Sequence, residues 1–134
     1  MTEQHPNILR YMRGIQEFND NDINNSVETL SFSENIVYRI AGKSPLAGEH
    51  RGIEKFTRIL QLAKELSGGT IAFEPQIVLA DDKTVMAYGH ATAKRDGKTL
   101  DIDHAYLYKL DDKGEIIEGR TIPIDLYAFD EFWS

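Results

Sequence analysis

Two histidines in the segment 84–110, His90 and His104, have the side chains best suited to acid–base chemistry in this chain. Histidine titrates near neutral pH and can accept or donate a proton. Tyr106 follows His104 by two residues, and its hydroxyl could donate a hydrogen bond to a ligand oxygen. The strand faces that carry these residues decide which of them could lie in a pocket.

Two strands joined by a tight turn carry both histidines. Residues 84–95 alternate strictly between small apolar and larger polar side chains, as a strand with two different faces does. Asp96-Gly97 is typical of a two-residue hairpin turn, which fixes the register with residues 98–110. A slip of one residue would exchange the faces of one strand. The predicted pairs are Ala93–Leu100, Ala91–Ile102, Gly89–His104 and Ala87–Tyr106 on one face, and Thr92–Asp101, His90–Asp103 and Tyr88–Ala105 on the other.

The first of these faces leaves room for either a covering helix or a ligand, because its side chains on residues 84–95 are small. Gly89, Ala91 and Ile102 would then line a pocket, with His104 at its floor. His104 is either a buried structural histidine, hydrogen-bonded to a tyrosine or a backbone carbonyl, or the polar group of an apolar ligand cavity.

The second face carries His90 beside Asp103, with Tyr88 nearby. A histidine next to a carboxylate can be catalytic, but this face is the convex one and has no cavity. We expect a structural or interface pair here. Asp101 and Asp103 lack a third ligand in the nearby sequence, so no metal site is predicted.

The remaining segments predict an α+β fold, in which helices precede a run of antiparallel strands. Helices are expected at 8–18, at 23–30 after an Asp22 N-cap, and at 53–66. Residues 41–52 are expected to form a loop. The expected strands are 35–40, 70–80, 84–95, 98–110 and 115–124, with Pro75 marking an edge strand or a bulge, and an aromatic-rich terminal segment at 125–133. The three helices should pack on the concave face of a curved sheet.

Composition narrows the class of protein. The 134 residues predict one domain, 1–134, and the net charge of −7 with scattered basic residues argues against a nucleic-acid surface. The chain has no cysteine, which excludes disulfides and thiolate chemistry. The polar start and the lack of a long apolar run predict no signal peptide and no membrane span, and therefore a cytoplasmic protein.

Four stretches, in this order and spacing, resemble the nuclear-transport-factor-two-like cone fold, also called a cystatin-like roll. They are the helix break Phe18 to Asp22, the glycine-containing loop Ile40 to Gly52, and the hairpins Arg95 to Leu100 and Lys113 to Glu118. The superfamily includes ketosteroid isomerases and SnoaL-like polyketide cyclases. The resemblance implies a single SnoaL-like domain and a homodimer formed through the convex face at Tyr88, His90 and Asp103.

The resemblance also identifies positions where this chain departs from both enzyme types. Arg39 occupies the position of the isomerases' general base, and Gly14 that of their first-helix tyrosine, with Tyr11 one turn earlier. Thr121 occupies the position of the cyclases' acid–base Asp. Tyr106 lies where the isomerases keep a protonated Asp in the oxyanion hole, and a phenol could serve as that donor.

Three further residues complete the predicted site. Asp125 is the carboxylate nearest to Thr121 and either acts in catalysis or caps the terminal segment. Arg39 either pairs with Asp125 or a ligand carboxylate, or extends to the mouth of the cavity. Trp133 belongs to the terminal aromatics, which either pack in the core or close over an apolar ligand.

The sequence therefore predicts a pocket for a small apolar or aromatic molecule that carries a carbonyl or carboxylate. If the protein is an enzyme, it would be an isomerase, cyclase or dehydratase without a bound cofactor. The alternative is a non-catalytic ligand-binding or dimerisation module. The catalytic candidates are His104, Tyr106 and Asp125; the ligand-binding candidates are Arg39, Tyr11, Gly89, Ala91, Ile102, Thr121 and Trp133.

Overall fold

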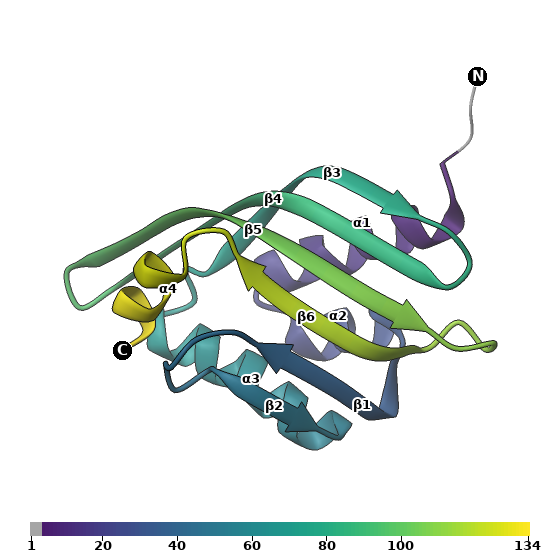
Figure 1. Cartoon of the computed structure of the whole chain (residues 1–134), viewed down its shortest axis with the longest axis horizontal. Coiled ribbons are helices and arrows are strands. Elements are labelled where there is room, and N and C mark those ends of the chain that lie inside the picture. The colour runs from purple at the N-terminus through teal and green to yellow at the C-terminus, as the bar shows by residue number, and fades with distance from the viewer. Residues whose placement is uncertain (1–3) are drawn as a thin grey trace.

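The computed structural model describes residues 4–134, which form helices packed against one curved six-stranded sheet (Figure 1). The helices are α1 (Pro6–Asn19), α2 (Ile23–Leu30), α3 (Ile53–Leu66) and α4 (Leu126–Trp133). The strands are β1 (Phe32–Ile40), β2 (Gly48–Arg51), β3 (Ala72–Ala80), β4 (Thr84–Arg95), β5 (Lys98–Leu110) and β6 (Ile116–Pro123).

The sheet is mixed, with strand order β2-β1-β6-β5-β4-β3. β1 and β6 run parallel, and the other neighbouring strands run antiparallel. α1, α2 and α3 cover one face of the sheet, and α4 lies at the end that carries the β4–β5 turn (Figure 1). The predicted α+β class, with a curved sheet and three helices on its concave face, is confirmed. No helix within residues 4–134 is long and apolar enough to cross a membrane.

The predicted register of β4 and β5 is confirmed. Gly89 pairs with His104, Ala91 with Ile102, and His90 with Asp103. Burial alternates along β4 as the sequence pattern indicates, with the small residues inside and the polar residues outside. His104 is therefore fixed on the inner face of the sheet, and His90 on the outer face.

Two segments differ from the sequence-based expectation. The predicted loop 41–52 contains the short strand β2, which pairs with β1 through four residues and has no alternating apolar pattern to reveal it. The terminal segment is a helix, although aromatic residues are weak helix formers. It forms here because Asp125 caps its first turn and because its aromatic side chains pack against the sheet.

Gly89 does not leave room for a ligand, in contrast to the sequence-based expectation. A Cβ atom at Gly89 would lie 2.1 Å from the backbone oxygen of Glu74 and 2.9 Å from the ring of Phe73. β3 approaches this closely at Pro75, which pairs with Gly89 directly before a β-bulge. The predicted bulge or edge strand at Pro75 is confirmed in both respects, since β3 is an edge strand.

We expect Gly89→Ala to lower the free energy of unfolding by about 1–3 kcal/mol, because the new methyl group must push the β3 backbone away. Urea unfolding followed by circular dichroism would measure this loss. Thr92→Ala, on the exposed face of the same strand, is the matched control and should change stability by less than about 0.5 kcal/mol. Equal stability of the two variants would contradict the close approach of β3.

Candidate functional site

A cavity of about 110 Å³ lies between the inner face of the sheet and the helices. An engineered apolar cavity of about 150 Å³ holds one benzene molecule, so this space is roughly that of a single ring. Most of its wall is aliphatic or aromatic. Its lining includes Ile15, Phe18, Leu30, Phe32, Ile40, Leu46, Phe56, Ile59, Leu60, Ala63, Ile71, Phe73, Tyr108, Phe129 and Trp133.

Two hydrogen-bonded pairs supply polar groups to this apolar wall. His104 Nδ1 lies 2.9 Å from the hydroxyl of Tyr106. The Tyr38 hydroxyl lies 2.7 Å from Thr121 Oγ1. Tyr106 and Thr121 are direct cross-strand partners on β5 and β6, so the two pairs lie side by side on the floor of the cavity.

The cavity is electrically neutral. Among residues 4–134, no Asp, Glu, Lys or Arg side chain lines it. Burial of His104 lowers the pKa of its imidazole from 6.5 to about 4, and nearby Asp103 opposes this only in part. Burial also raises the pKa of Tyr38 to about 12 and that of Tyr106 well above its ordinary value. At neutral pH these groups are therefore uncharged and act through hydrogen bonds.

The hydrogen-bond pattern indicates which nitrogen of His104 carries the proton. Within residues 4–134, His104 Nδ1 is the only hydrogen-bond partner of the Tyr106 hydroxyl. If Nδ1 donated, both the Tyr106 O–H and His104 Nε2 would be left unpaired, whereas a Tyr106 donor leaves only Nε2 unpaired, so we assign the donor role to Tyr106. In a neutral imidazole the proton then lies on Nε2. This buried N–H has no acceptor among the described residues and is available to a ligand oxygen.

The cavity wall brings together four of the predicted site residues. His104, Tyr106, Thr121 and Trp133 all contribute to its lining, and their roles toward a ligand stay predictions. The indole Nε1 of Trp133 is buried and, like His104 Nε2, has no hydrogen-bond partner within residues 4–134.

Four other predicted ligand-binding residues lie outside the lining. Tyr11 is buried, with its ring packed 5.6 Å from that of Tyr108. Gly89 lies against β3, as described above. Ala91 is fully buried, and Ile102 is its cross-strand partner. The small residues of β4 therefore allow close packing rather than ligand access.

The predicted pair of Arg39 and Asp125 is wrong. Arg39 projects away from the cavity and forms an ion pair with Glu49 of β2, with 2.8 Å between Nη2 and Oε1. Asp125 lies outside the cavity lining and caps α4, where its carboxylate accepts a hydrogen bond of 3.0 Å from the backbone N–H of Ala128. Capping, one of its two predicted roles, is confirmed.

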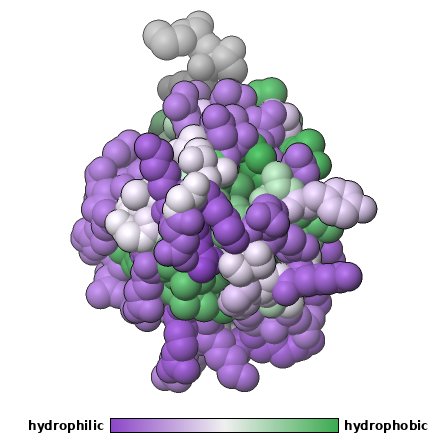
Figure 2. All heavy atoms as spheres, turned by 90° about the vertical axis from the view of Figure 1, so that its left-hand side faces the viewer, coloured by the Kyte–Doolittle hydropathy of each residue, from purple (hydrophilic) through white to green (hydrophobic). Residues whose placement is uncertain are grey.

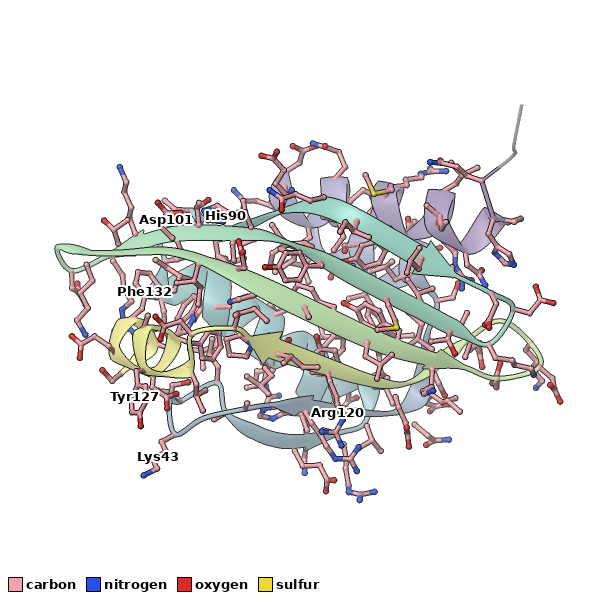
Figure 3. The ribbon with its side chains drawn as sticks, turned by 45° about the horizontal axis from the view of Figure 1, so that its top comes forward. Lys43, His90, Asp101, Arg120, Tyr127 and Phe132 are labelled. Carbon is pink, nitrogen blue, oxygen red and sulfur yellow. The ribbon has the colours of Figure 1, made fainter. Side chains whose placement is uncertain are left out.

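The outer face of the sheet carries a separate polar cluster. His90 and Asp101 lie close together there (Figure 3), and both ring nitrogens of His90 contact carboxylates, Nδ1 to Asp103 at 2.9 Å and Nε2 to Asp101. Tyr88 donates a hydrogen bond of 2.5 Å to Asp103. Asp103 and then Asp101 raise the pKa of His90. The cluster is open to solvent, which supports a structural or interface role.

Sequence reasoning did not assign a site role to Tyr38, although strand parity contained the signal. Ile36, Tyr38 and Ile40 share one face of β1 and are buried or half-buried, so Arg39 between them had to point away. No group of three or more His, Asp or Glu side chains within residues 4–134 is arranged to hold a metal ion.

Comparison with solved structures shows which proteins share this architecture. Bal32a, from a soil-derived mobile gene cassette, matches with a TM-score of 0.87 and 34% sequence identity over 96% of each chain. A Xanthomonas campestris protein of unknown function with a cystatin-like fold matches with a TM-score of 0.86 and 23% identity, over 97% of this chain and 99% of that one. A putative SnoaL-like polyketide cyclase from Jannaschia sp. CCS1 matches with a TM-score of 0.78 and 17% identity, over 100% of this chain and 98% of that one.

Two more distant structures carry informative descriptions. An NTF2-like protein of unknown function from Burkholderia pseudomallei matches with a TM-score of 0.84 and 8% identity, over 98% of this chain and 99% of that one. A Mycobacterium tuberculosis protein in complex with estradiol-17β-hemisuccinate matches with a TM-score of 0.75 and 13% identity, over 92% of this chain and 98% of that one. No protein-family description matches the chain, and neither does any curated protein.

The lowered pKa of His104 predicts a loss of stability in acid. Between pH 6.5 and about 4 the unfolded state binds a proton at this residue and the folded state does not. As the pH is lowered through this window, the free energy of unfolding should therefore decrease by up to about 1.4 kcal/mol per pH unit. We expect His104→Gln to remove this part of the slope, as measured by urea unfolding at several pH values. Carboxylates titrate in the wild type and in the variant alike, so their contribution cancels when the two pH profiles are compared. Parallel pH profiles would therefore contradict a buried neutral His104.

Proposed function

We propose that the chain, which has the fold of NTF2-like and SnoaL-like structures, is a member of the NTF2-like superfamily, and that its cavity binds a small, uncharged apolar or aromatic molecule that carries a carbonyl oxygen. The observation that carries this proposal is His104 Nε2, a buried nitrogen without a hydrogen-bond partner in the wall of a mainly apolar cavity, which is a donor in the tautomer assigned above. A carbonyl oxygen would complete its hydrogen bonding, and the aromatic wall would bury the rest of the molecule.

The absence of charge in the lining within residues 4–134 favours a neutral ligand over a carboxylate. Arg39, the cation expected from the sequence, lies outside the cavity and is paired with Glu49. A carboxylate in this space would lose its hydration without gaining a counter-ion, which is far more costly than burying a hydrogen-bonded carbonyl. The Mycobacterium tuberculosis neighbour in complex with estradiol-17β-hemisuccinate supports small-molecule binding by this fold, without bearing on the charge of the ligand.

A second candidate function is proton transfer without a bound cofactor, as in an isomerisation, cyclisation or dehydration. The His104–Tyr106 hydrogen bond inside the cavity favours it, because the neutral imidazole could move a proton or polarise a carbonyl. Tyr106 holds the ring of His104 through Nδ1, so its expected role shifts from an oxyanion donor to a group that orients the imidazole. The resemblance seen in the sequence puts Arg39 and Thr121 at the positions of the acid–base carboxylates of the two enzyme types, which favours binding over catalysis.

We also propose that two copies of the chain associate through the outer face of the sheet. Ile77, Leu79, Met86 and Ile122, which we call the outer apolar patch, are each at least 40% exposed. Strand pairing places Leu79 beside Met86 and Ile77 beside Tyr88 of the His90 cluster, with Ile122 on the other side of Ala105 in the same row across the sheet. An apolar sheet face of this kind is typical of an interface between subunits.

The ligand proposal predicts a preference for neutral probes. We expect 4-fluoroacetophenone to bind and 4-fluorobenzoate to bind at least about tenfold more weakly, because the carboxylate finds no counter-ion. Titration followed by ¹⁹F NMR would measure both affinities. His104→Phe should weaken the binding of 4-fluoroacetophenone about tenfold, because the ketone loses its hydrogen-bond donor. His50→Phe, on β2 and outside the cavity lining, is the control. Equal binding of the two probes would exclude the neutral-ligand proposal.

The dimer proposal predicts that charge on the outer apolar patch separates the subunits. Leu79 and Met86 are cross-strand partners, and we expect Leu79→Glu with Met86→Glu to give the mass of one chain, 15.2 kDa, in sedimentation experiments. The wild-type chain should give twice that mass. Leu9→Glu, an equally exposed position on α1, should leave the dimer intact. A wild-type chain that sediments as a monomer would refute the interface.

A further inference from the structure

We propose that α4 is a movable wall of the cavity, and that Arg95 and Lys98 are positioning residues that hold it closed. This inference rests on the proposed binding of a ligand. α4 supplies part of the cavity lining, but it belongs neither to the sheet nor to the three helices that cover it. Figure 2 shows the end of the molecule that carries α4 and the β4–β5 turn, where the surface is mainly hydrophilic with smaller apolar areas between.

α4 closes one end of the cavity with aromatic side chains. Phe129 and Trp133 line the cavity and are each only 2% exposed. The Phe129 ring lies 5.4 Å from that of His104, so the helix covers the imidazole directly. Phe132, which points inward in Figure 3, packs edge-on against Trp133. Movement of α4 would therefore uncover His104, the residue expected to meet the ligand.

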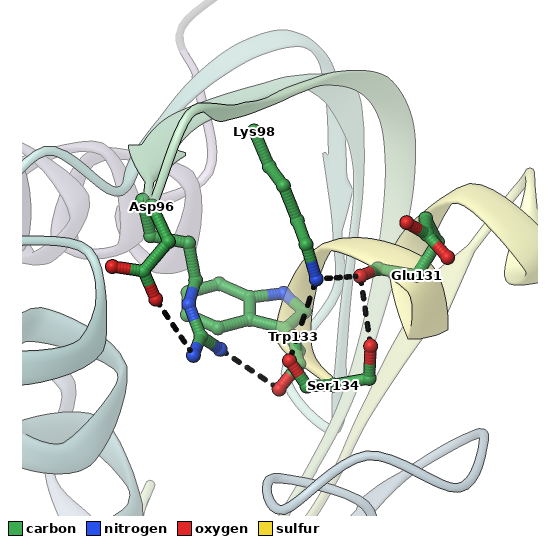
Figure 4. A network of polar contacts seen from close by, with 6 residues as sticks. Asp96, Lys98, Glu131, Trp133 and Ser134 are labelled. Atoms are coloured by element: carbon green, nitrogen blue, oxygen red, sulfur yellow. Dashed lines mark hydrogen bonds and ion pairs between the residues drawn. The ribbon is translucent and has the colours of Figure 1, made fainter.

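The C-terminal end of α4 is fastened by two cations from the β4–β5 hairpin (Figure 4). Arg95 Nη1 donates a hydrogen bond of 2.9 Å to the carbonyl oxygen of Trp133. Lys98 Nζ donates to the carbonyl oxygens of Glu131 at 2.8 Å and Ser134 at 3.5 Å. The last carbonyls of a helix have no partners within it and carry its negative dipole end, so cations are favourable there.

The Arg95 bond is partly buried, whereas the Lys98 contacts are exposed and water can replace them. The third contact is a hydrogen bond of 3.0 Å from the backbone N–H of Lys43 to Asp130, at an exposed position. Exposed polar contacts of this kind stabilise a structure by no more than about 1 kcal/mol each. The closed position of α4 therefore depends on aromatic packing together with a few contacts that can be exchanged for water.

The junction between α4 and the sheet also contains an unusual share of unpaired buried donors. Within residues 4–134, five buried side-chain atoms lack a hydrogen-bond partner, and three of them, His104 Nε2, Arg95 Nε and Trp133 Nε1, belong to residues at this junction. Each unpaired donor destabilises the closed form. Outward movement of α4 would let water reach these groups, which lowers the cost of opening.

The size of the cavity gives a reason for such movement. About 110 Å³ is below the roughly 300–1,000 Å³ of pockets that hold larger organic ligands. A substituted ring fills more space than this cavity, so part of the wall must move to admit it, and we infer that α4 is that part because a few contacts with the β4–β5 hairpin hold its C-terminal end. Gating helices and loops commonly set the rate at which ligands enter and leave.

The test compares Lys98→Met, and Lys98→Met combined with Arg95→Met, with the control Lys94→Met, which removes a charge from an exposed position of the same hairpin. Hydrogen exchange of residues 126–134 is measured without ligand. We expect it to rise at least about fivefold in the double variant and to stay unchanged in the control, with β5 protected in both. Lys98 is only partly buried, so its single variant folds even if the Arg95 change does not.

Dissociation of 4-fluoroacetophenone, followed by ¹⁹F NMR exchange, gives the second readout. The double variant should release the probe at least about fivefold faster, with its Kd changed by less than about threefold, because a held wall affects entry and exit together. Unchanged hydrogen exchange at 126–134, or an unchanged dissociation rate of the probe in the double variant, overturns the movable wall. Failure of the wild-type chain to bind any probe would instead refute the proposed function, while hydrogen exchange would still decide whether Arg95 and Lys98 hold α4.

Discussion

The rest of the structure depends on the two-residue turn between β4 and β5. Asp96 and Gly97 both have positive φ angles, 46° and 77°, as a type I′ turn requires. With this turn in place, twelve residue pairs follow along the two longest strands. A shift of one position would turn His104 and Tyr106 out of the core and bring Asp101 and Asp103 into it. The turn therefore decides which polar groups are buried.

Strand parity separates two electrostatic environments across one sheet. On the inner face, His104 Nδ1 and Thr121 Oγ1 are hydrogen-bonded to tyrosine hydroxyls, and burial keeps the imidazole neutral. On the outer face, His90 lies between two carboxylates that favour its charged form. The same residue type thus has a lowered pKa on one side and a raised pKa on the other. This contrast follows from burial and from the neighbouring charges.

Much of the fold could be predicted from the sequence because local signals and long strands agree. The Asp96-Gly97 turn, the alternation of residues 84–95 and the bounds of α3 were all readable. The position of Arg39 was misjudged because it was inferred by counting residues along the family pattern. The apolar residues Tyr38 and Ile40 on either side of it indicate the opposite, that the Arg39 side chain points away from the core. β2 has too few residues to form a pattern, and α4 depends on the packing of its aromatic side chains against strands that are distant in the sequence.

The clearest wrong prediction was that the small residues of β4 leave room for a ligand. A glycine opposite a histidine fits a ligand pocket and a close backbone approach equally well, and only the position of Pro75 on β3 distinguishes them. Trp133 could be placed at the cavity as one of several terminal aromatics, yet its unpaired indole nitrogen depends on the packing of α4. Such features arise from tertiary structure and leave no periodic signal in the chain.

The parallel pairing of β1 with β6 has a consequence for the order of folding. Tyr38 and Thr121 meet across this pair although 83 residues separate them. Closing so long a loop costs chain entropy before the contact yields any stability, and contacts of high sequence separation slow folding. β4 and β5 can pair early, through a local turn, whereas the cavity wall that contains Tyr38 must wait for β6. During synthesis, the helices and β1 would emerge well before the strand that completes their core, and their apolar surface would stay exposed until then.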